Sequence, residues 1–208
     1  MTLRLAVFAS GRGSNLLALH DAIQDGRIPG AELALVVCDQ PATPVASKVR
    51  ERKLPIFVFN SKDFPGKADY EQTIHEQLTE NGIGLIVLAG YLRLIGPTLL
   101  KPWEGRIINL HPSLLPKFPG KDAIKQAWKA GVSATGVTVH FVDSGIDSGP
   151  VIAQEQVLLN PEDTLETLAE RIHRTEHRLL PEVVRALVQQ GPLHVWERVR
   201  TPELVRNS

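Results

Sequence analysis

An asparagine and a histidine stand two residues apart in the stretch INLHPSLLP, at Asn109 and His111. Side chains two apart on a β-strand point to the same side of the pleat, so a strand here presents both groups together. An amide N–H₂ beside an imidazole is a suitable pair to stabilise a developing oxyanion. From this stretch alone, a histidine satisfied by the backbone at a strand end is an equally good interpretation.

An aspartate in a later loop favours the catalytic interpretation. Asp147 lies in the glycine-flanked stretch SGIDSG, between two segments that read as strands. Turns favour aspartate for their own reasons. A carboxylate near an imidazole, however, also stabilises the imidazolium form and fixes the orientation of the ring. Asparagine, histidine and aspartate together indicate an acyl- or formyl-transfer site that has no covalent nucleophile.

A glycine-rich turn near the N-terminus is a candidate anion site. The stretch SGRGSN, residues 10–15, follows an apolar run and opens an amphipathic stretch. Unpaired N–H groups and the positive end of the helix dipole gather at such a helix start and suit a phosphate. Gly13 gives the turn its freedom, Ser14 and Asn15 are able to cap the helix or donate to an oxyanion, and Arg12 adds a cation.

Two other interpretations of the glycine turn stay open. A dinucleotide fingerprint needs a third glycine at position 16, where the chain has Leu16, and Asp39 is only a loose match to the ribose-binding acid. The spacing of a Walker loop is absent as well. A monophosphate cradle therefore fits best, ahead of a plain capped turn and of a nicotinamide dinucleotide site.

A second histidine pattern suggests a metal site. The stretch HRTEH, from His173 to His177, matches the HxxEH pattern of some zinc peptidases. A histidine pair four residues apart is more often a polar helix face, and no third ligand is evident nearby. We therefore expect no metal. A serine hydrolase would need GxSxG, which SGRGS does not match.

The elements that position these residues alternate between strand and helix in the first part of the chain. Continuous apolar runs indicate strands covered on both faces, and amphipathic stretches indicate helices. The expected strands are 5–9, 34–38, 56–59, 85–89 and 107–110, and the expected helices are 14–25, 43–53, 67–81 and 121–130. This order predicts an α/β fold with a doubly wound, mostly parallel sheet and helices on both faces.

The pattern changes after residue 131. Residues 135–142 and 151–159 alternate and predict antiparallel strands joined by a turn-rich loop. A long helix is expected from about 164 to 190, with a kink at Pro181 or a division into two helices there. Residues 192–199 are expected to form a last edge strand.

Composition bounds the class of protein. The chain has 208 residues, equal numbers of basic and acidic side chains (23 each) and one cysteine, Cys38. No global charge attracts nucleic acid or anionic lipid, and no apolar run approaches the roughly 20 residues of a transmembrane helix. We expect one domain spanning 1–208, a cytoplasmic protein that is a monomer or homodimer, with no nucleic-acid or membrane partner.

Over nearly its whole length the chain resembles the phosphoribosylglycinamide formyltransferases, the glycinamide ribonucleotide transformylases of purine synthesis. The resemblance rests on SGRGSNL, LAGYLRLI, INLHPSLLPKFPG, TGVTVHFVDSGIDSGPVI and RTEHRLLPEVV, in family order and spacing. It implies a Rossmann-like formyltransferase fold, with a phosphate-substrate-binding half (1–100) and a catalytic, folate-binding half (101–208). It also implies formyl transfer from 10-formyltetrahydrofolate to the amine of 5-phosphoribosylglycinamide.

The resemblance implies roles for individual residues. Gly13, Ser14 and Asn15 would hold the substrate phosphate beside Arg12; Glu176 would bind the ribose hydroxyls, with His173 in the same pocket. The formyl folate would contact two loops, together with Asn109 and a basic residue at its glutamate tail. These folate contacts are Lys67, Leu92, Arg93, Leu94, Ile95, Asp143, Ser144, Gly145, Ile146 and Asp147.

Asn109, His111 and Asp147 match the family's catalytic residues. The amine would attack the formyl carbon, Asn109 and a protonated His111 would stabilise the tetrahedral intermediate, and Asp147 would keep the imidazole charged. One position departs from the family: Asp122 stands where a histidine is usual. We do not expect Asp122 to be catalytic.

Three alternatives to this function remain. A methionyl-tRNA formyltransferase would need a further C-terminal domain, and a formyltetrahydrofolate hydrolase a further N-terminal one. A non-catalytic nucleotide-binding protein would need only the glycine turn, and would give Asn109, His111 and Asp147 no purpose.

Overall fold

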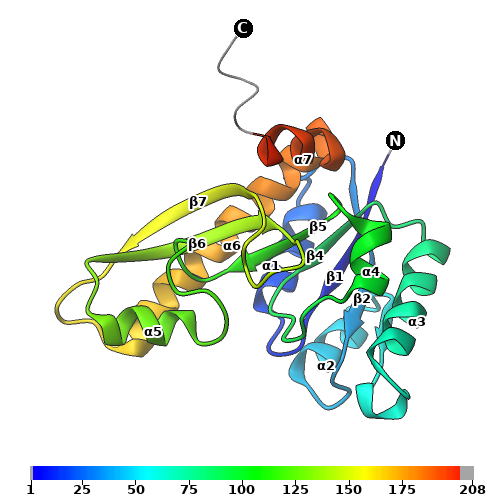
Figure 1. Ribbon diagram of the computed structural model, residues 1–208, viewed down its shortest axis with the longest axis horizontal. Coiled ribbons are helices and arrows are strands. Elements are labelled where there is room, and N and C mark those ends of the chain that lie inside the picture. The colour runs from blue at the N-terminus through cyan, green and yellow to red at the C-terminus, as the bar shows by residue number, and fades with distance from the viewer. Residues whose placement is uncertain (1, 202–208) are drawn as a thin grey trace, which may run out of the picture.

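The computed structural model describes residues 2–201, and its strands form one seven-stranded sheet (Figure 1). The sheet order is β3-β2-β1-β4-β5-β6-β7, and the strands are β1 Leu3–Phe8, β2 Ala31–Cys38, β3 Ile56–Val58, β4 Leu85–Leu88, β5 Ile107–His111, β6 Ala134–Phe141 and β7 Val151–Leu158. β1 to β5 pair in parallel, whereas β5–β6 and β6–β7 pair antiparallel. The sheet is therefore mostly parallel with an antiparallel C-terminal part, as expected from the sequence.

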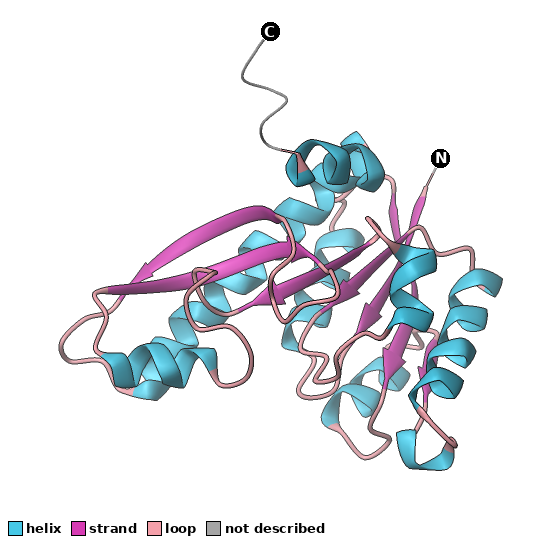
Figure 2. Ribbon diagram, in the orientation of Figure 1, coloured by secondary structure: helices cyan, strands magenta, loops and turns pink. Residues whose placement is uncertain are grey.

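Helices cover both faces of the sheet (Figure 2). One face packs against α1 Ser14–Gln24, α2 Pro44–Glu51, α6 Leu165–Gln190 and α7 Pro192–Arg200. The other face packs against α3 Lys67–Glu80, α4 Pro97–Leu100 and the short 3₁₀ helix Lys101–Trp103. A further helix, α5 Ala123–Ala130, lies beside α6. Among residues 2–201, no helix is both long and apolar enough to cross a membrane.

The apolar runs explain why both faces are covered. In β1, Leu5 and Val7 join the core under α1 and α6, while Ala6 and Phe8 join the core under α3 and α4. Successive side chains of a strand point to opposite faces, so a strand that is apolar at every position needs a cover on each side. Doubly wound topology supplies that cover.

The main error of the sequence prediction lies at residues 192–199, which are helical. α7 begins with Pro192 at its first turn and buries Val195 and Trp196. The ring of Trp196 meets that of Phe141 edge-on, with centroids 5.1 Å apart. Because β7 already forms the edge of the sheet, the segment stabilises itself by packing as a helix on α6 and β7. Of the two alternatives expected at Pro181, a kink or a division into two helices, the division is wrong, because α6 continues through the proline.

Candidate active site

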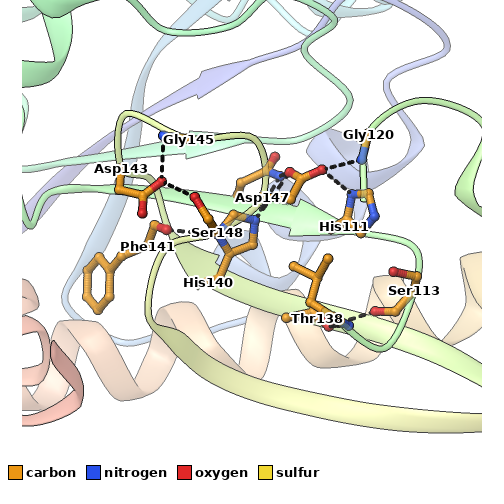
Figure 3. A network of polar contacts seen from close by, with 12 residues as sticks. His111, Ser113, Gly120, Thr138, His140, Phe141, Asp143, Gly145, Asp147 and Ser148 are labelled. Atoms are coloured by element: carbon orange, nitrogen blue, oxygen red, sulfur yellow. Dashed lines mark hydrogen bonds and ion pairs between the residues drawn. The ribbon is translucent and has the colours of Figure 1, made fainter. Parts of the chain in front are cut away.

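Three side chains from β5 and a later loop meet on one face of the sheet. Ile108 and Leu110 point into the core under α6, so Asn109 and His111 point to the opposite face. The Asp147 carboxylate lies between them: its Oδ1 is 3.2 Å from Asn109 Nδ2 and its Oδ2 is 3.3 Å from His111 Nδ1 (Figure 3). The structure thus brings together the three residues that the sequence singled out for catalysis.

A fourth member of this cluster, His140, was missed by the sequence analysis. The antiparallel register of β5 and β6 sets His140 opposite Asn109. Its Nε2 lies 3.1 Å from Asn109 Nδ2 and 3.6 Å from Asp147 Oδ1, and its Nδ1 lies 2.8 Å from the Phe141 carbonyl. The Nδ1 proton is donated to that carbonyl, so in the neutral ring Nε2 accepts from the Asn109 amide. We call Asn109, His111, His140 and Asp147 the Asp147 cluster.

The surroundings of His111 suit its doubly protonated form. The ring is 4% exposed; its Nε2 lies 2.9 Å from the Phe118 carbonyl oxygen and its Nδ1 faces the Asp147 carboxylate. Both ring nitrogens therefore face acceptors, and only an imidazolium donates from both. The 3.3 Å separation between Nδ1 and Asp147 exceeds the ~2.7–2.9 Å of a strong charge-assisted bond.

Asp147 is held as a carboxylate. Burial raises the pKa of Asp147, but the interactions with His140, the Gly120 N–H and the charge of His111 outweigh burial, so the net pKa lies below its usual value. The Gly120 N–H donates to Oδ2 over 2.7 Å. The Asp147 backbone has a φ of 50°, a left-handed conformation that aspartate adopts more readily than most residues.

Asp122 takes no part in this cluster. It precedes α5 with a φ of 58°, and its side chain is exposed and makes no capping hydrogen bond. The expectation that Asp122 is not catalytic is consistent with this position.

The glycine turn joins β1 to α1. Gly13 is the residue before the helix, with a φ of 73° and no side-chain cap, so Ser14 and Asn15 lie inside the first turn instead of capping it. A Cβ at Gly13 would lie 2.5 Å from Val45 Cγ2. The Arg12 carbonyl accepts a hydrogen bond from Lys48 over 3.0 Å, and the Arg12 side chain is exposed. The turn is thus held by α2 and presents the positive end of α1 to solvent.

The proposed ribose residues on α6 reach this turn. Glu176 Oε2 accepts from Asn15 Nδ2 over 3.0 Å and pairs with His173 Nδ1 over 2.9 Å. This hydrogen bond is the largest cause of a raised pKa for His173, opposed by burial and by the charge of Arg12. Within residues 2–201, no three histidine, cysteine, aspartate or glutamate side chains are grouped to hold a metal. The glutamate of the HxxEH pattern, Glu176, instead bonds Asn15 of the glycine turn.

The segment 92–95 follows β4 and is fixed by side chains from three other elements. The anchoring contacts are Leu92 N to Ser10 Oγ (3.1 Å), Arg93 Nε to Asp39 Oδ2 (2.6 Å) and Gly96 N to Glu71 Oε1 (2.6 Å). Asp39, the loose match to a ribose-binding acid, is thereby paired with Arg93. The backbone is held in place while Leu92 and Leu94 remain 61% and 60% exposed.

The loop 143–147 presents a similar apolar surface. Asp143 Oδ1 accepts from the Gly145 N–H over 3.0 Å and from Ser148 Oγ over 2.8 Å, which ties the loop to itself (Figure 3). Ile146 at its tip is 57% exposed.

Lys67 opens α3, and its amine lies 3.8 Å from Glu71 Oε1. Glu71 also accepts from the N–H of Gly96, the residue after the segment 92–95, which places Lys67 near the end of that segment.

Comparison with known proteins identifies relatives of this arrangement. Residues 3–184 match the formyl transferase family. The chain is 48% identical to a phosphoribosylglycinamide formyltransferase of Bacillus subtilis, over 89% of this chain and 94% of that one. The crystal structure of glycinamide ribonucleotide transformylase 1 from Geobacillus kaustophilus superposes with a TM-score of 0.88 at 55% identity, over 90% of this chain and 100% of that one. A trifunctional purine biosynthetic protein of Drosophila pseudoobscura pseudoobscura is 39% identical over 99% of this chain and 15% of its own length.

Proposed function

The chain belongs to the formyl transferase family, and we propose that it transfers the formyl group of 10-formyltetrahydrofolate to the amine of 5-phosphoribosylglycinamide. The names of its relatives place this reaction in purine biosynthesis. The observation that carries the proposal is the Asp147 carboxylate, which contacts both Asn109 and His111. The cluster contains an amide, two imidazoles and a carboxylate, which suits direct attack by the substrate amine.

The glycine turn and α6 are the proposed acceptor site. The N-terminus of α1, with Gly13 to Asn15 and the exposed Arg12, would bind the phosphate. Glu176, 4% exposed, would accept hydrogen bonds from the ribose hydroxyls, with His173 beside it. Because Glu176 already contacts Asn15, the phosphate and ribose subsites adjoin. The acceptor site therefore draws on residues from both proposed halves, 1–100 and 101–208.

The segment 92–95 and the loop 143–147 are the proposed folate site. Their exposed Leu92, Leu94 and Ile146 would cover the faces of the pteridine, while backbone groups bind its edge. The anchors on Asp39 and Glu71 hold the backbone in place before the folate arrives. Lys67 would meet the anionic glutamate tail.

The proposed chemistry is addition followed by elimination. The glycinamide amine attacks the formyl carbon, the carbonyl electron pair moves to oxygen, and a tetrahedral intermediate forms. The Asn109 N–H₂ and the Nδ1–H of His111 would stabilise its oxyanion, each turning from Asp147. The intermediate then expels N10 of the folate, which takes a proton from His111, while the ammonium proton of the attacking amine passes to the Asp147 carboxylate through water.

Folate absorbance tests this function. Mixing the enzyme with 10-formyltetrahydrofolate and 5-phosphoribosylglycinamide should convert the formyl folate to tetrahydrofolate at a rate that saturates in the acceptor. The reaction should yield formylated acceptor in equal amount. Equal folate turnover without acceptor would indicate a hydrolase and contradict the proposal. Turnover only with an aminoacylated tRNA would contradict it as well.

A further inference from the structure

The carbonyl that accepts from His111 belongs to a residue with an unusual backbone. Phe118 has a φ of 54°, although it is neither glycine nor one of the residues that tolerate this region well. Its carbonyl oxygen lies 2.9 Å from His111 Nε2. Left-handed backbone at a bulky residue is unfavourable and persists only where the surroundings enforce it. The contacts that hold Phe118 in this conformation therefore also position its carbonyl against His111.

Ser113 supplies this constraint from inside the turn. Its side chain is fully buried, and its hydroxyl lies 2.6 Å from the Lys117 carbonyl oxygen and 3.3 Å from that of Phe118. A hydroxyl has one proton, so the Lys117 bond dominates and the Phe118 carbonyl is the secondary acceptor. Both contacts fix the two peptides that aim the Phe118 carbonyl at the imidazole.

Ser113 is itself fixed to the sheet (Figure 3). Thr138 Oγ1 on β6 donates to the Ser113 carbonyl over 2.6 Å and accepts from the Leu115 N–H over 3.2 Å. Gln154 on β7 donates to the Leu115 carbonyl over 2.8 Å. The turn 113–118 is thus tied to β6, which carries His140 of the Asp147 cluster, and to β7.

We propose that Ser113 is a positioning residue, which holds the Phe118 carbonyl against Nε2 of His111 and so commits Nε2 to the backbone. Nδ1 is then the nitrogen left to face Asp147 and the reacting group. Ser113 itself touches no substrate; it determines which of the two imidazole protons takes part in catalysis. The catalytic consequence rests on the proposed formyl transfer, whereas the effect on the ring does not.

Two substitutions and one control test this role. Ser113→Ala removes the hydroxyl without adding volume, and Ser113→Cys keeps a donor at the same position that is larger and weaker than the hydroxyl. The control is Thr135→Val: Thr135 is 1% exposed on β6, and its hydroxyl has no hydrogen-bond partner within residues 2–201. The control also changes a buried hydroxyl, but one that does not reach Phe118.

Nitrogen NMR of ¹⁵N-histidine-labelled protein reads the ring directly, without substrate. The chain has seven histidines, so His111 is assigned by comparison with His111→Gln. In the parent protein and in Thr135→Val, the neutral His111 ring should carry its proton on Nε2. In Ser113→Ala the proton should be shared between both nitrogens, with Ser113→Cys in between. An unchanged tautomer in Ser113→Ala overturns the proposal, whatever happens to turnover.

Turnover tests the catalytic consequence. The loss of one hydrogen bond predicts a fall in kcat of about tenfold in Ser113→Ala, with KM for both substrates unchanged. The alkaline limb of the kcat–pH profile should move to lower pH, because an imidazolium bonds to a carbonyl more strongly than a neutral ring does. A changed tautomer with parental kcat and pH profile would overturn the catalytic part. A parent enzyme inactive on 5-phosphoribosylglycinamide would refute the proposed function and leave the NMR result to decide the role of Ser113.

Discussion

Asp147 is the residue on which the candidate site depends. Its two carboxylate oxygens contact Asn109, His111, His140 and the Gly120 N–H, which come from β5, β6 and the turn before α5. A carboxylate is well suited to this position, because it accepts several hydrogen bonds and offers none. An uncharged replacement would have to present an N–H to one of these donors.

Asp147→Asn should therefore reduce kcat by about 10²–10³, the usual loss when an oxyanion-stabilising arrangement is disturbed. The amide has one acceptor oxygen in place of two: with that oxygen at the Oδ2 position its N–H₂ faces the Asn109 amide nitrogen, and with it at the Oδ1 position both His111 and the Gly120 N–H lose their acceptor. Steady-state kinetics with both substrates saturating measures the effect. Asp122→Asn is the matched control, since Asp122 is exposed and outside the cluster. Parental kcat in Asp147→Asn would contradict the catalytic assignment.

Asp147 should also contribute to stability as a function of pH. Its pKa in the folded protein lies below the ordinary value of 3.8, so the folded state binds this proton less readily than the unfolded state. The contribution is present above the unfolded pKa and is lost as pH falls through the folded pKa. Denaturant unfolding at pH 6 and at successively lower pH should show the parent losing stability below about pH 4 more steeply than Asp147→Asn. Parallel curves would refute this.

Only part of the arrangement around Asp147 could be predicted from the sequence. The two-residue spacing of Asn109 and His111 predicted their shared face, and the glycine-flanked loop marked Asp147. His140 was missed although it also lies on a strand, because its contact with Asn109 depends on the register of β5 and β6. A long connection containing α5 joins these strands, so no turn type fixes their register in the sequence. The roles of the Gly120 N–H and the Phe118 carbonyl could not be predicted either, because they depend on the backbone conformation of the connection after β5.

At the scale of elements, the glycine turn packs closely against α2, and the missing Cβ of Gly13 permits this close contact. Gly13→Ala places a Cβ 2.5 Å from Val45 Cγ2 and forces a φ of 73° on alanine. We expect a loss of about 1–3 kcal/mol in the free energy of unfolding and a raised KM for the phosphorylated acceptor. Thermal melts and steady-state kinetics measure the two effects.

Gly11→Ala is the control for this substitution, because a Cβ there meets nothing within 4 Å and its φ is not in the left-handed region. It should retain most of the parent's stability. Equal losses in the two variants would mean that the packing against α2 is not what the turn requires.

The contact between α1 and α6 gives a second element-scale prediction. Glu176→Gln removes the carboxylate that is the main cause of the raised pKa of His173, so NMR titration should show that pKa falling. In the parent, the stability gained from this pair is complete below the ordinary histidine value of 6.5 and is lost as pH rises through the raised pKa. We also expect a higher acceptor KM with little change in kcat. An unchanged His173 titration would contradict the pairing of Glu176 with His173.

Helices and strands could be predicted from the sequence where the hydrophobic periodicity was strong. At α7 the periodicity was weak, and the prediction was wrong. Residues 192–199 alternate well enough to resemble a strand, yet the segment is helical because only α6 and the sheet face beside it are available to bury Val195 and Trp196. Whether another strand already forms the edge of the sheet depends on the tertiary structure and not on the sequence of this segment. The long helix α6, whose period is clear over many turns, was placed within one residue of its observed ends.

At the scale of the whole molecule, sheet order brings the proposed subsites together. The chain runs from β1 outward to β3, then returns to β4 on the other side of β1 and continues to β5. The glycine turn follows β1, the segment 92–95 follows β4, and His111 is the last residue of β5. These three strands are adjacent and parallel. Their carboxyl ends share one edge of the sheet, at the switch point where doubly wound folds bind ligands. The proposed acceptor and folate subsites therefore adjoin the Asp147 cluster.

Trp196 packs on the face of the sheet opposite the Asp147 cluster, and it tests whether packing on that face affects the cluster. Trp196 is 8% exposed, packs on Phe141 and lies against Gly105, all on the α6 side or its edge, whereas the Asp147 cluster lies on the opposite face. Trp196→Ala should lower the free energy of unfolding by about 3–5 kcal/mol, measured by denaturant titration. Trp128→Ala, at a residue 40% exposed, should cost much less. We expect unchanged kcat in folded Trp196→Ala, which would show that the two faces act independently. Because Phe141 adjoins His140 in β6, a fall in kcat would instead show that the sheet transmits the loss of packing at Trp196 to the Asp147 cluster.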